Sequence, residues 1–194
     1  QKVGEGRHVL HIDTKSGVKE CTVITKNGLV SKVTVDMGKA ELAPEKVPVR
    51  LEGEKVVNKP ISIGGNVYRI TCCSMGNPHC TVFVPSVDKL DLEDLGPKFE
   101  HDPMFPDRVN VEFVEVIDQH TLKARIWERG SGETMACGTG ACAAVVASVL
   151  NGHCKKDTDV DVLLLGGTLT IRYTGDTVLM TGNAVEVFTG TVEV

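Results

Sequence analysis

The sequence lacks the features that would place a protein in a membrane or on nucleic acid. No apolar run in its 194 residues approaches the roughly 20 residues that a membrane-spanning helix needs. No basic start followed by an apolar stretch marks a secretory signal. The formal net charge of -5 disfavours binding to a phosphate backbone, which depends on clustered Lys and Arg. We therefore expect a cytoplasmic protein that binds neither membranes nor nucleic acid.

The cysteines also lack the patterns of a metal site or a redox motif. There are seven, an odd number, and no CxxC pair of the zinc or thioredoxin kind. A disulfide framework and a metal site are therefore not expected. A free cysteine in such a chain is most often a small buried hydrophobic residue, so a reactive one must be distinguished by its surroundings.

What the sequence does contain is many short runs typical of strands. The runs 20–25 and 29–37 are rich in Val and Thr and flank Asn27-Gly28, the strongest short-range signal for a β-hairpin. Other runs of this kind are mostly separated by Gly, Pro, Asn or Asp. Further strands are predicted at 7–13, 47–51, 61–63, 67–72, 81–84, 109–116, 121–127, 160–165, 169–173, 178–181 and 184–194.

Two stretches, 92–99 and 139–150, have the character of helices. The second, TGACAAVVASVL, has apolar or small residues on every side and is followed by Asn151-Gly152, a plausible C-cap. A helix without a polar face is buried all round. Because so many predicted strands surround it in the sequence, we expect an α+β fold in which a curved, mostly antiparallel sheet wraps around one buried central helix.

The segment 128–144, ERGSGETMACGTGACAA, gives the strongest indication of chemistry. Its small residues lead directly into the buried helix, so the free amides of Gly138, Thr139 and Gly140 can converge on a carboxylate or phosphate. Cys137 lies at the same helix start, where the macrodipole favours the thiolate, and we expect it to react fast near neutral pH. A tight turn with an inert, packed cysteine is the alternative. No Gly-Lys-Ser/Thr follows the glycines, which excludes a P-loop.

A second polar cluster, SMGNPHC at 74–80, lies between two predicted strands. Asn77 offers a donor and an acceptor for an amino acid head group, and His79 can hydrogen-bond a thiol and tune its pKa. A structural turn with a solvent-facing His is the alternative. Polar residues in or just after apolar strands are either satisfied within the core or contact a ligand. Three more residues are of this kind: Asn110, Glu128 and Arg129.

The motifs SMGNPHC, RVNVEF and ERGSGETMACGTGACAA, in this order and at these separations, resemble the diaminopimelate epimerase family. The likeness runs through essentially the whole chain, including VTVDMGKAEL at 33–42. It implies an isomerase that interconverts LL- and meso-diaminopimelate, precursors of lysine and peptidoglycan, by a two-cysteine acid/base mechanism without a cofactor. It also implies two pseudo-symmetric α/β domains, each a curved sheet around a central helix, with the active site between them.

The resemblance further implies a role for each candidate residue. Cys137 would be one catalytic acid/base, Gly138 and Thr139 would bind the α-carboxylate of a small amino acid substrate, and His79 would support the opposite cysteine. Glu128, near Cys137, would contact the distal amino group. The remaining residues would contact the distal carboxylate and amino groups: Arg129, Asn77 and Asn110.

In this family the second cysteine lies in an amino-terminal Cys-Gly-Asn-Gly motif, which these 194 residues do not contain. The start on Gln1 is interpreted as a cut. By resemblance, residues 1–37 and 183–194 are strands of an incomplete amino-terminal domain, and residues 38–182 form the carboxy-terminal catalytic domain. We expect the chain alone to be inactive, to have the missing domain as its partner, and to expose a surface that favours association, for example as a homodimer.

Two other functions stay open at this point. Proline racemase-like isomerases also use paired cysteines, and phenazine-biosynthesis-like isomerases share the architecture without them. From another class, the chain could be a non-catalytic module that binds an anion at the helix start. The polar set around Glu128-Arg129 favours a substrate with a second amino acid head group over proline.

Overall fold

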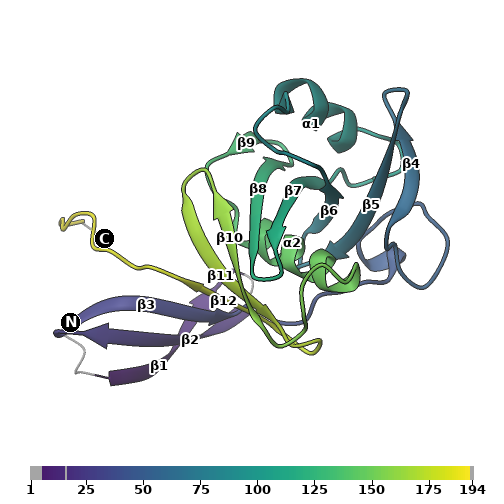
Figure 1. Cartoon of the computed structure of the whole chain (residues 1–194). Coiled ribbons are helices and arrows are strands. Elements are labelled where there is room, and N and C mark those ends of the chain that lie inside the picture. The colour runs from purple at the N-terminus through teal and green to yellow at the C-terminus, as the bar shows by residue number, and fades with distance from the viewer. Residues whose placement is uncertain (1–5, 16, 193–194) are drawn as a thin grey trace. The chain divides into compact units, whose positions relative to one another are not determined.

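The computed structural model describes residues 6–15 and 17–192, and it divides into two compact units (Figure 1). Unit 1 is formed by residues 1–36 and 181–194, and unit 2 by residues 37–180. Among the described residues, no helix is long and apolar enough to span a membrane.

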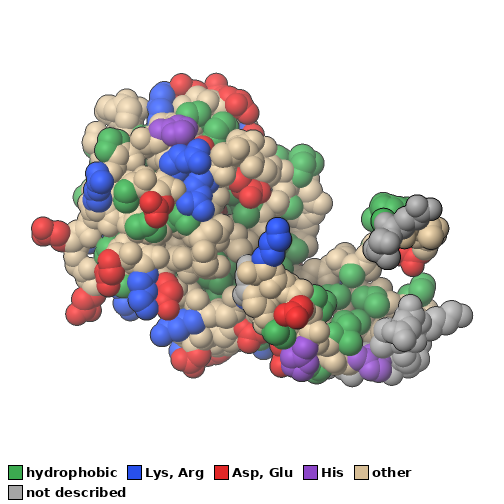
Figure 2. Space-filling view, turned by 180° about the vertical axis from the view of Figure 1, so that it is seen from behind, with side chains coloured by type: hydrophobic (Ala, Val, Ile, Leu, Met, Phe, Trp, Pro, Cys, Tyr) green, Lys and Arg blue, Asp and Glu red, His purple; other side chains and the backbone are tan. Residues whose placement is uncertain are grey.

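Unit 1 is built on an antiparallel meander of β1 (Gly6–Thr14), β2 (Gly17–Lys26) and β3 (Leu29–Asp36). Asn27 and Gly28 form the tight β2–β3 turn with φ of 55° and 72°, which confirms the predicted hairpin. Its strands carry an apolar groove of about 840 Å³ lined by residues such as Leu10, Ile12 and Val33. Figure 2 shows hydrophobic side chains gathered on this unit.

The strand predicted at 184–194 is wrong for its described part, because residues 183–192 adopt no strand. Val187 and Phe188 there are 88% and 83% exposed. A run with β-like composition becomes a strand only where a neighbour supplies ladder hydrogen bonds and a surface to pack on.

Unit 2 holds both helices and the rest of the strands. The strands lie in the order β12-β11-β10-β8-β7-β6-β5-β4, with β9 beside β8, and β12 runs on into unit 1. β6 pairs in parallel with β7, as does β8 with β10, so the sheet is mixed but mostly antiparallel. Its elements are β4 (Lys59–Ile63), β5 (Asn66–Ser74), β6 (Pro78–Phe83), α1 (Leu92–Glu100), β7 (Asn110–Asp118), β8 (Thr121–Glu128), β9 (Gly132–Thr134), α2 (Gly138–Leu150), β10 (Asp159–Leu164), β11 (Gly167–Tyr173) and β12 (Val178–Gly182).

The apolar helix predicted at 139–150 is α2, and it is buried from Gly140 to Ser148. It contacts β5, β6, β7, β8, β10 and β11, and the strands curve around it in Figure 1. Asn151 caps its carboxyl end, and Gly152 follows with a φ of 77°, as the Asn-Gly pair predicts. Asn151 Nδ2 also donates to Thr71 Oγ1 of β5 at 2.8 Å, which fixes that end of the helix to the sheet.

The strand predicted at 47–51 is wrong, because this segment follows a short 3-10 helix, Pro44–Lys46, and runs as a loop. Val47 and Val49 are nevertheless buried, at 0% and 6% exposed. Two prolines, Pro44 and Pro48, remove backbone donors that a strand ladder would need, so the apolar side chains reach the core from a loop.

Helix α1 packs against β8 through a contact that only glycine allows. A Cβ placed on Gly96 would lie 2.1 Å from Cδ2 of Trp127. The indole Nε1 donates to Glu100 Oε2 at 2.7 Å, and the backbone N–H of Gly130 donates to Glu100 Oε1 at 2.8 Å. Helix α1 thereby holds the turn that follows Glu128, which begins the segment leading to Cys137.

Candidate active site

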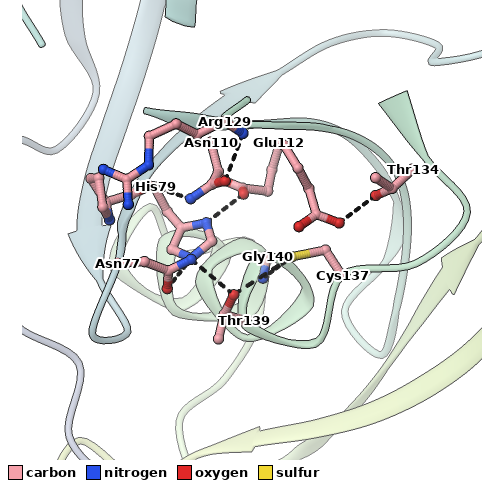
Figure 3. A network of polar contacts seen from close by, with 11 residues as sticks. Asn77, His79, Asn110, Glu112, Arg129, Thr134, Cys137, Thr139 and Gly140 are labelled. Carbon is pink, nitrogen blue, oxygen red and sulfur yellow. Dashed lines mark hydrogen bonds and ion pairs between the residues drawn. The ribbon is translucent and has the colours of Figure 1, made fainter. Parts of the chain in front are cut away.

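Cys137 is the N-cap residue of α2, as predicted from the small residues that precede the helix. Its φ and ψ of -134° and 113° are extended, and its Sγ accepts the N–H of Gly140 at 3.4 Å. Thr139 Oγ1 lies 3.5 Å from the same sulfur. The sulfur therefore occupies the position of a capping side chain, among the free amides of the first turn. Figure 3 shows these groups converging.

The protonation of Cys137 differs from the expected thiolate. Burial is the largest influence and raises the pKa of Cys137 to about 11, because Sγ lies in a residue only 7% exposed. Hydrogen bonds from Thr139 and Gly140 lower this pKa, and the carboxylates of Glu112 and Glu128 raise it further. The helix start thus stabilises the anion, but desolvation outweighs it, and the resting group is a thiol.

Alkylation of Cys137 is therefore expected to be slow near neutral pH and to accelerate as pH rises towards about 11. Iodoacetamide labelling across pH, with the modified cysteine located by mass spectrometry, measures this. The same residue in urea-unfolded chain serves as the control, with a transition near the ordinary value of about 8.5. A folded-state transition at or below that value would contradict the effect of burial.

A row of polar side chains lies on one face of β6 and β7. The parallel register places His79 opposite Asn110 and Thr81 opposite Glu112, so all four side chains share a face of the sheet. His79 and Glu112 are both 0% exposed, and His79 Nδ1 lies 2.6 Å from Glu112 Oε1. The solvent-facing alternative for His79 is therefore excluded.

Asn77 connects this buried pair to the helix start. Its Oδ1 lies 3.0 Å from His79 Nε2, and its Nδ2 donates to Thr139 Oγ1 at 3.3 Å. Hydrogen bonds thus run continuously from β7 through Glu112, His79, Asn77 and Thr139 to the sulfur of Cys137 (Figure 3).

Asn110 connects the start of β6 to the turn that follows β8. It is 4% exposed; its Nδ2 donates to the carbonyl of Pro78 at 2.7 Å, and its Oδ1 accepts the N–H of Arg129 at 2.9 Å. The guanidinium of Arg129 donates to the carbonyl of Asp107 at 2.7 Å. Both groups of the Asn110 amide are therefore occupied by backbone partners.

Glu128 is half-buried at the end of β8 and accepts a hydrogen bond from Thr134 Oγ1 at 2.6 Å. Its carboxylate lies close enough to raise the pKa of Cys137. The structure therefore brings Asn77, His79, Glu128 and Cys137 into one site, with Asn110 behind it.

Glu112 is the site residue that the sequence reasoning missed. It lies in the motif RVNVEF, where a carboxylate flanked by Val and Phe in a strand was a signal of a buried charge. Burial raises its pKa, and His79 opposes this. A Cβ on Gly140 would lie 3.1 Å from its Oε1 and 3.3 Å from Cys137 Sγ, so the carboxylate lies directly behind the helix start.

The other cysteines do not share this setting. All seven are free and buried, and Cys72 faces Cys80 across β5 and β6. Burial raises the pKa of Cys73 and Cys80, and these two residues lie within β5 and β6 rather than at a helix N-cap. In the part of the chain that the structure describes, no group of three or more His, Cys, Asp or Glu side chains is placed to hold a metal ion.

Sequence comparison places the chain beside one well-defined group of proteins. Residues 71–187 match the family model described as diaminopimelate epimerase. The diaminopimelate epimerase of Acetivibrio thermocellus is 49% identical over 189 residues, covering 96% of this chain and 67% of that protein. The enzyme of the same name from Desulfovibrio desulfuricans is 46% identical over 95% of this chain and 66% of its own length. The chain thus spans about two thirds of these relatives.

Solved structures show the same fold at much lower identity. A probable proline racemase from Agrobacterium radiobacter superposes with a TM-score of 0.68 at 14% identity, over 94% of this chain and 59% of that one. A PhzF-family phenazine biosynthesis protein from Bacillus anthracis superposes with a TM-score of 0.52 at 15% identity, over 92% of this chain and 66% of that one. The fold is therefore the mixed, mostly antiparallel sheet with two helices that these proteins share.

Proposed function

Since this chain belongs to the diaminopimelate epimerase family, we propose that it supplies one of the two acid/base cysteines of an epimerase acting on LL- and meso-diaminopimelate. The observation that carries this proposal is Cys137 at the start of α2, with its sulfur capping Gly140 and hydrogen-bonded to Thr139. No other cysteine of the described chain has that position.

Epimerisation removes the α-proton from one face of the carbon and returns a proton to the other, so it needs a base and an acid on opposite sides. In the proposal, Cys137 serves one face and a second cysteine serves the other. When Cys137 acts as the acid, its thiol proton passes to the carbanion and leaves a thiolate. That thiolate is stabilised by the N–H of Gly140 and the hydroxyl of Thr139. Its raised pKa supports the acid role, because the thiol is the resting form.

The substrate α-carboxylate would bind at the free amides of Gly138 and Thr139, whose partial positive charge also stabilises negative charge developing on the carboxylate. Asn77 and Glu128 flank this position and would receive the polar groups of the substrate, with Arg129 for the distal carboxylate. We propose a positioning role for Asn110, because its amide already ties the carbonyl of Pro78 to the N–H of Arg129. His79 would act through Asn77.

The domain organisation belongs to the same proposal. Residues 38–182 would form the catalytic domain, and residues 1–37 and 183–194 would belong to a second domain of the same design. The apolar groove of unit 1 supports this, since in unit 2 the corresponding apolar face is filled by α2. The missing domain would bring its own central helix and the second cysteine.

The experiment is exchange of the α-proton of LL-diaminopimelate in deuterated water, followed by NMR. The protein extended to the full length of its relatives is expected to exchange the proton and form the meso isomer. The chain of 194 residues alone is expected to do neither. Turnover by the chain alone, at a rate comparable with the full-length protein, would overturn the two-cysteine proposal.

A non-catalytic anion-binding module is the second candidate, supported by the same free amides at the start of α2. Such a module would bind a carboxylate ligand but would not exchange the α-proton of that ligand, either as this chain alone or as the full-length protein. Offering proline in parallel with diaminopimelate distinguishes a diaminopimelate epimerase from a proline racemase-like enzyme. Proline has no distal head group for Glu128 and Arg129 to contact.

A further inference from the structure

The hydrogen bonds that connect Glu112 to Cys137 can all donate towards the sulfur or all donate away from it. Which of the two arrangements forms depends on which atoms carry the protons. We propose that Glu112 is a positioning residue: with His79 it keeps a proton on His79 Nε2, and so makes every donor in this chain of side chains point towards the sulfur of Cys137. This deepens the proposed function, which rests on Cys137 as an acid/base, and concerns a residue to which that function assigns no role.

The first step is the buried pair. Glu112 and His79 are both 0% exposed, and Glu112 Oε2 has no hydrogen-bond partner among the described residues. An ionised carboxylate beside a neutral imidazole would leave an unbalanced negative charge in the core, which is costly. Taking up one further proton makes the pair neutral. One proton then lies between Glu112 Oε1 and His79 Nδ1, over 2.6 Å, and the other is on His79 Nε2.

The second step carries this asymmetry to the helix start. An Nε2–H can only donate, so it selects Oδ1 of Asn77, which lies 3.0 Å away. The Nδ2 group of Asn77 is then turned to Thr139 and donates to Oγ1 at 3.3 Å. Since that hydroxyl accepts from Asn77, its own hydrogen is free to point at Cys137 Sγ, 3.5 Å away.

The result is a hydroxyl that donates to the sulfur and stabilises the thiolate. In the opposite direction, the sulfur would donate to Thr139, and the thiol would be stabilised instead. Glu112 thus acts on the pKa of Cys137 in two opposed ways. Through space, its negative charge raises this pKa. Through the hydrogen bonds by way of His79, Asn77 and Thr139, Glu112 lowers this pKa. Neutralising the pair removes most of the first effect and leaves the second.

Other titratable groups near the sulfur also bear on the pKa of Cys137. Glu128 on β8 and Glu112 on β7 are the carboxylates that raise the pKa of Cys137, and Cys137 in turn raises the pKa of Cys142 on α2. His79 on β6 reaches the sulfur only through Asn77 and Thr139.

The experiment measures the pKa of Cys137 in the chain as it exists, by the pH dependence of its alkylation. Glu112→Gln keeps the shape but lets the amide either accept from Nδ1–H or donate to a bare Nδ1, so the preference for Nε2–H is lost. The pKa of Cys137 is expected to rise by about half a pH unit or more. Glu128→Gln, which only removes a like charge, is expected to lower it. Glu115→Gln, on the same strand, is the control and is expected to leave it unchanged.

A double-mutant cycle tests the route. Thr139→Val removes the hydroxyl that ends this series of hydrogen bonds and is expected to raise the pKa of Cys137. Adding Glu112→Gln to Thr139→Val is expected to raise this pKa no further. An unchanged or lowered pKa in Glu112→Gln, or additive effects in the double variant, overturns the proposal. Because no turnover is measured, these outcomes are independent of whether the full-length protein epimerises diaminopimelate.

A second measurement needs no variant at position 112. The ¹⁵N chemical shifts of His79 in the wild-type chain are expected to show a protonated Nε2 at neutral pH. A bare Nε2 with the proton on Nδ1 alone would overturn the proposal, whatever the stability of the substituted proteins.

Discussion

Cys137→Ser in the full-length protein is expected to lower the rate of α-proton exchange of diaminopimelate by about 1,000-fold. Serine keeps the shape of the N-cap and still accepts the N–H of Gly140, so helix α2 is retained. What is lost is a group acidic enough to give its proton to the substrate and to act as a base once deprotonated, because a hydroxyl is a far weaker acid than a thiol. The loss of rate should appear in kcat, with substrate binding little changed.

The matched control is Cys154→Ser, since Cys154 is also a buried thiol of unit 2 but has no place in the hydrogen bonds that end at Cys137. It is expected to retain most of the exchange rate. An equal loss in both variants would show that the effect comes from disturbing the core. Exchange in Cys137→Ser within tenfold of the wild type would remove Cys137 from the mechanism.

Gly96→Ala is expected to destabilise unit 2 by about 3 kcal/mol or more. The added methyl group would lie 2.1 Å from Cδ2 of Trp127, and the indole ring cannot turn away without breaking the bond from Nε1 to Glu100. The usual gain in helix propensity from Gly to Ala, about 1 kcal/mol, is too small to offset this overlap. Urea unfolding followed by Trp127 fluorescence measures the change, because this is the one tryptophan in the chain.

Gly138→Ala is the matched substitution. Its Cβ would meet Met180 Sδ at 3.0 Å, and a thioether at the end of a flexible side chain can move aside. A much smaller loss of stability is therefore expected, within about 1 kcal/mol of the wild type. Equal losses at both positions would show that the rigidity of the indole is not the cause.

Local patterns were enough to predict one element of each unit. The hairpin at Asn27-Gly28 and the buried helix at 139–150 were predicted correctly, because a turn that needs positive φ and a helix apolar on all sides are each specified by neighbouring residues. The position of Cys137 followed from the second of these. The loop at 47–51 was predicted wrongly as a strand, since its buried valines satisfy the same apolar pattern while two prolines prevent a ladder.

Interactions between segments distant in sequence could not be predicted from local sequence patterns. The contact of Glu112 with His79 depends on the parallel register of β6 and β7, which no local pattern shows. The protonation of Cys137 was predicted with the wrong sign because the position of a sulfur at a helix start is visible in the sequence, whereas the depth at which it is buried is not.

The hairpin formed by β5 and β6 is hydrogen-bonded to both ends of α2. Thr71 receives Asn151 at the carboxyl end, and Asn77, in the turn between the two strands, reaches Thr139 at the amino end. A helix held by the same hairpin at both ends cannot slide along its axis without losing both contacts. The position of Cys137 relative to the sheet therefore depends on the length of the segment between Thr71 and Asn77, so an insertion or deletion there would shift the sulfur even though it alters no residue of the helix.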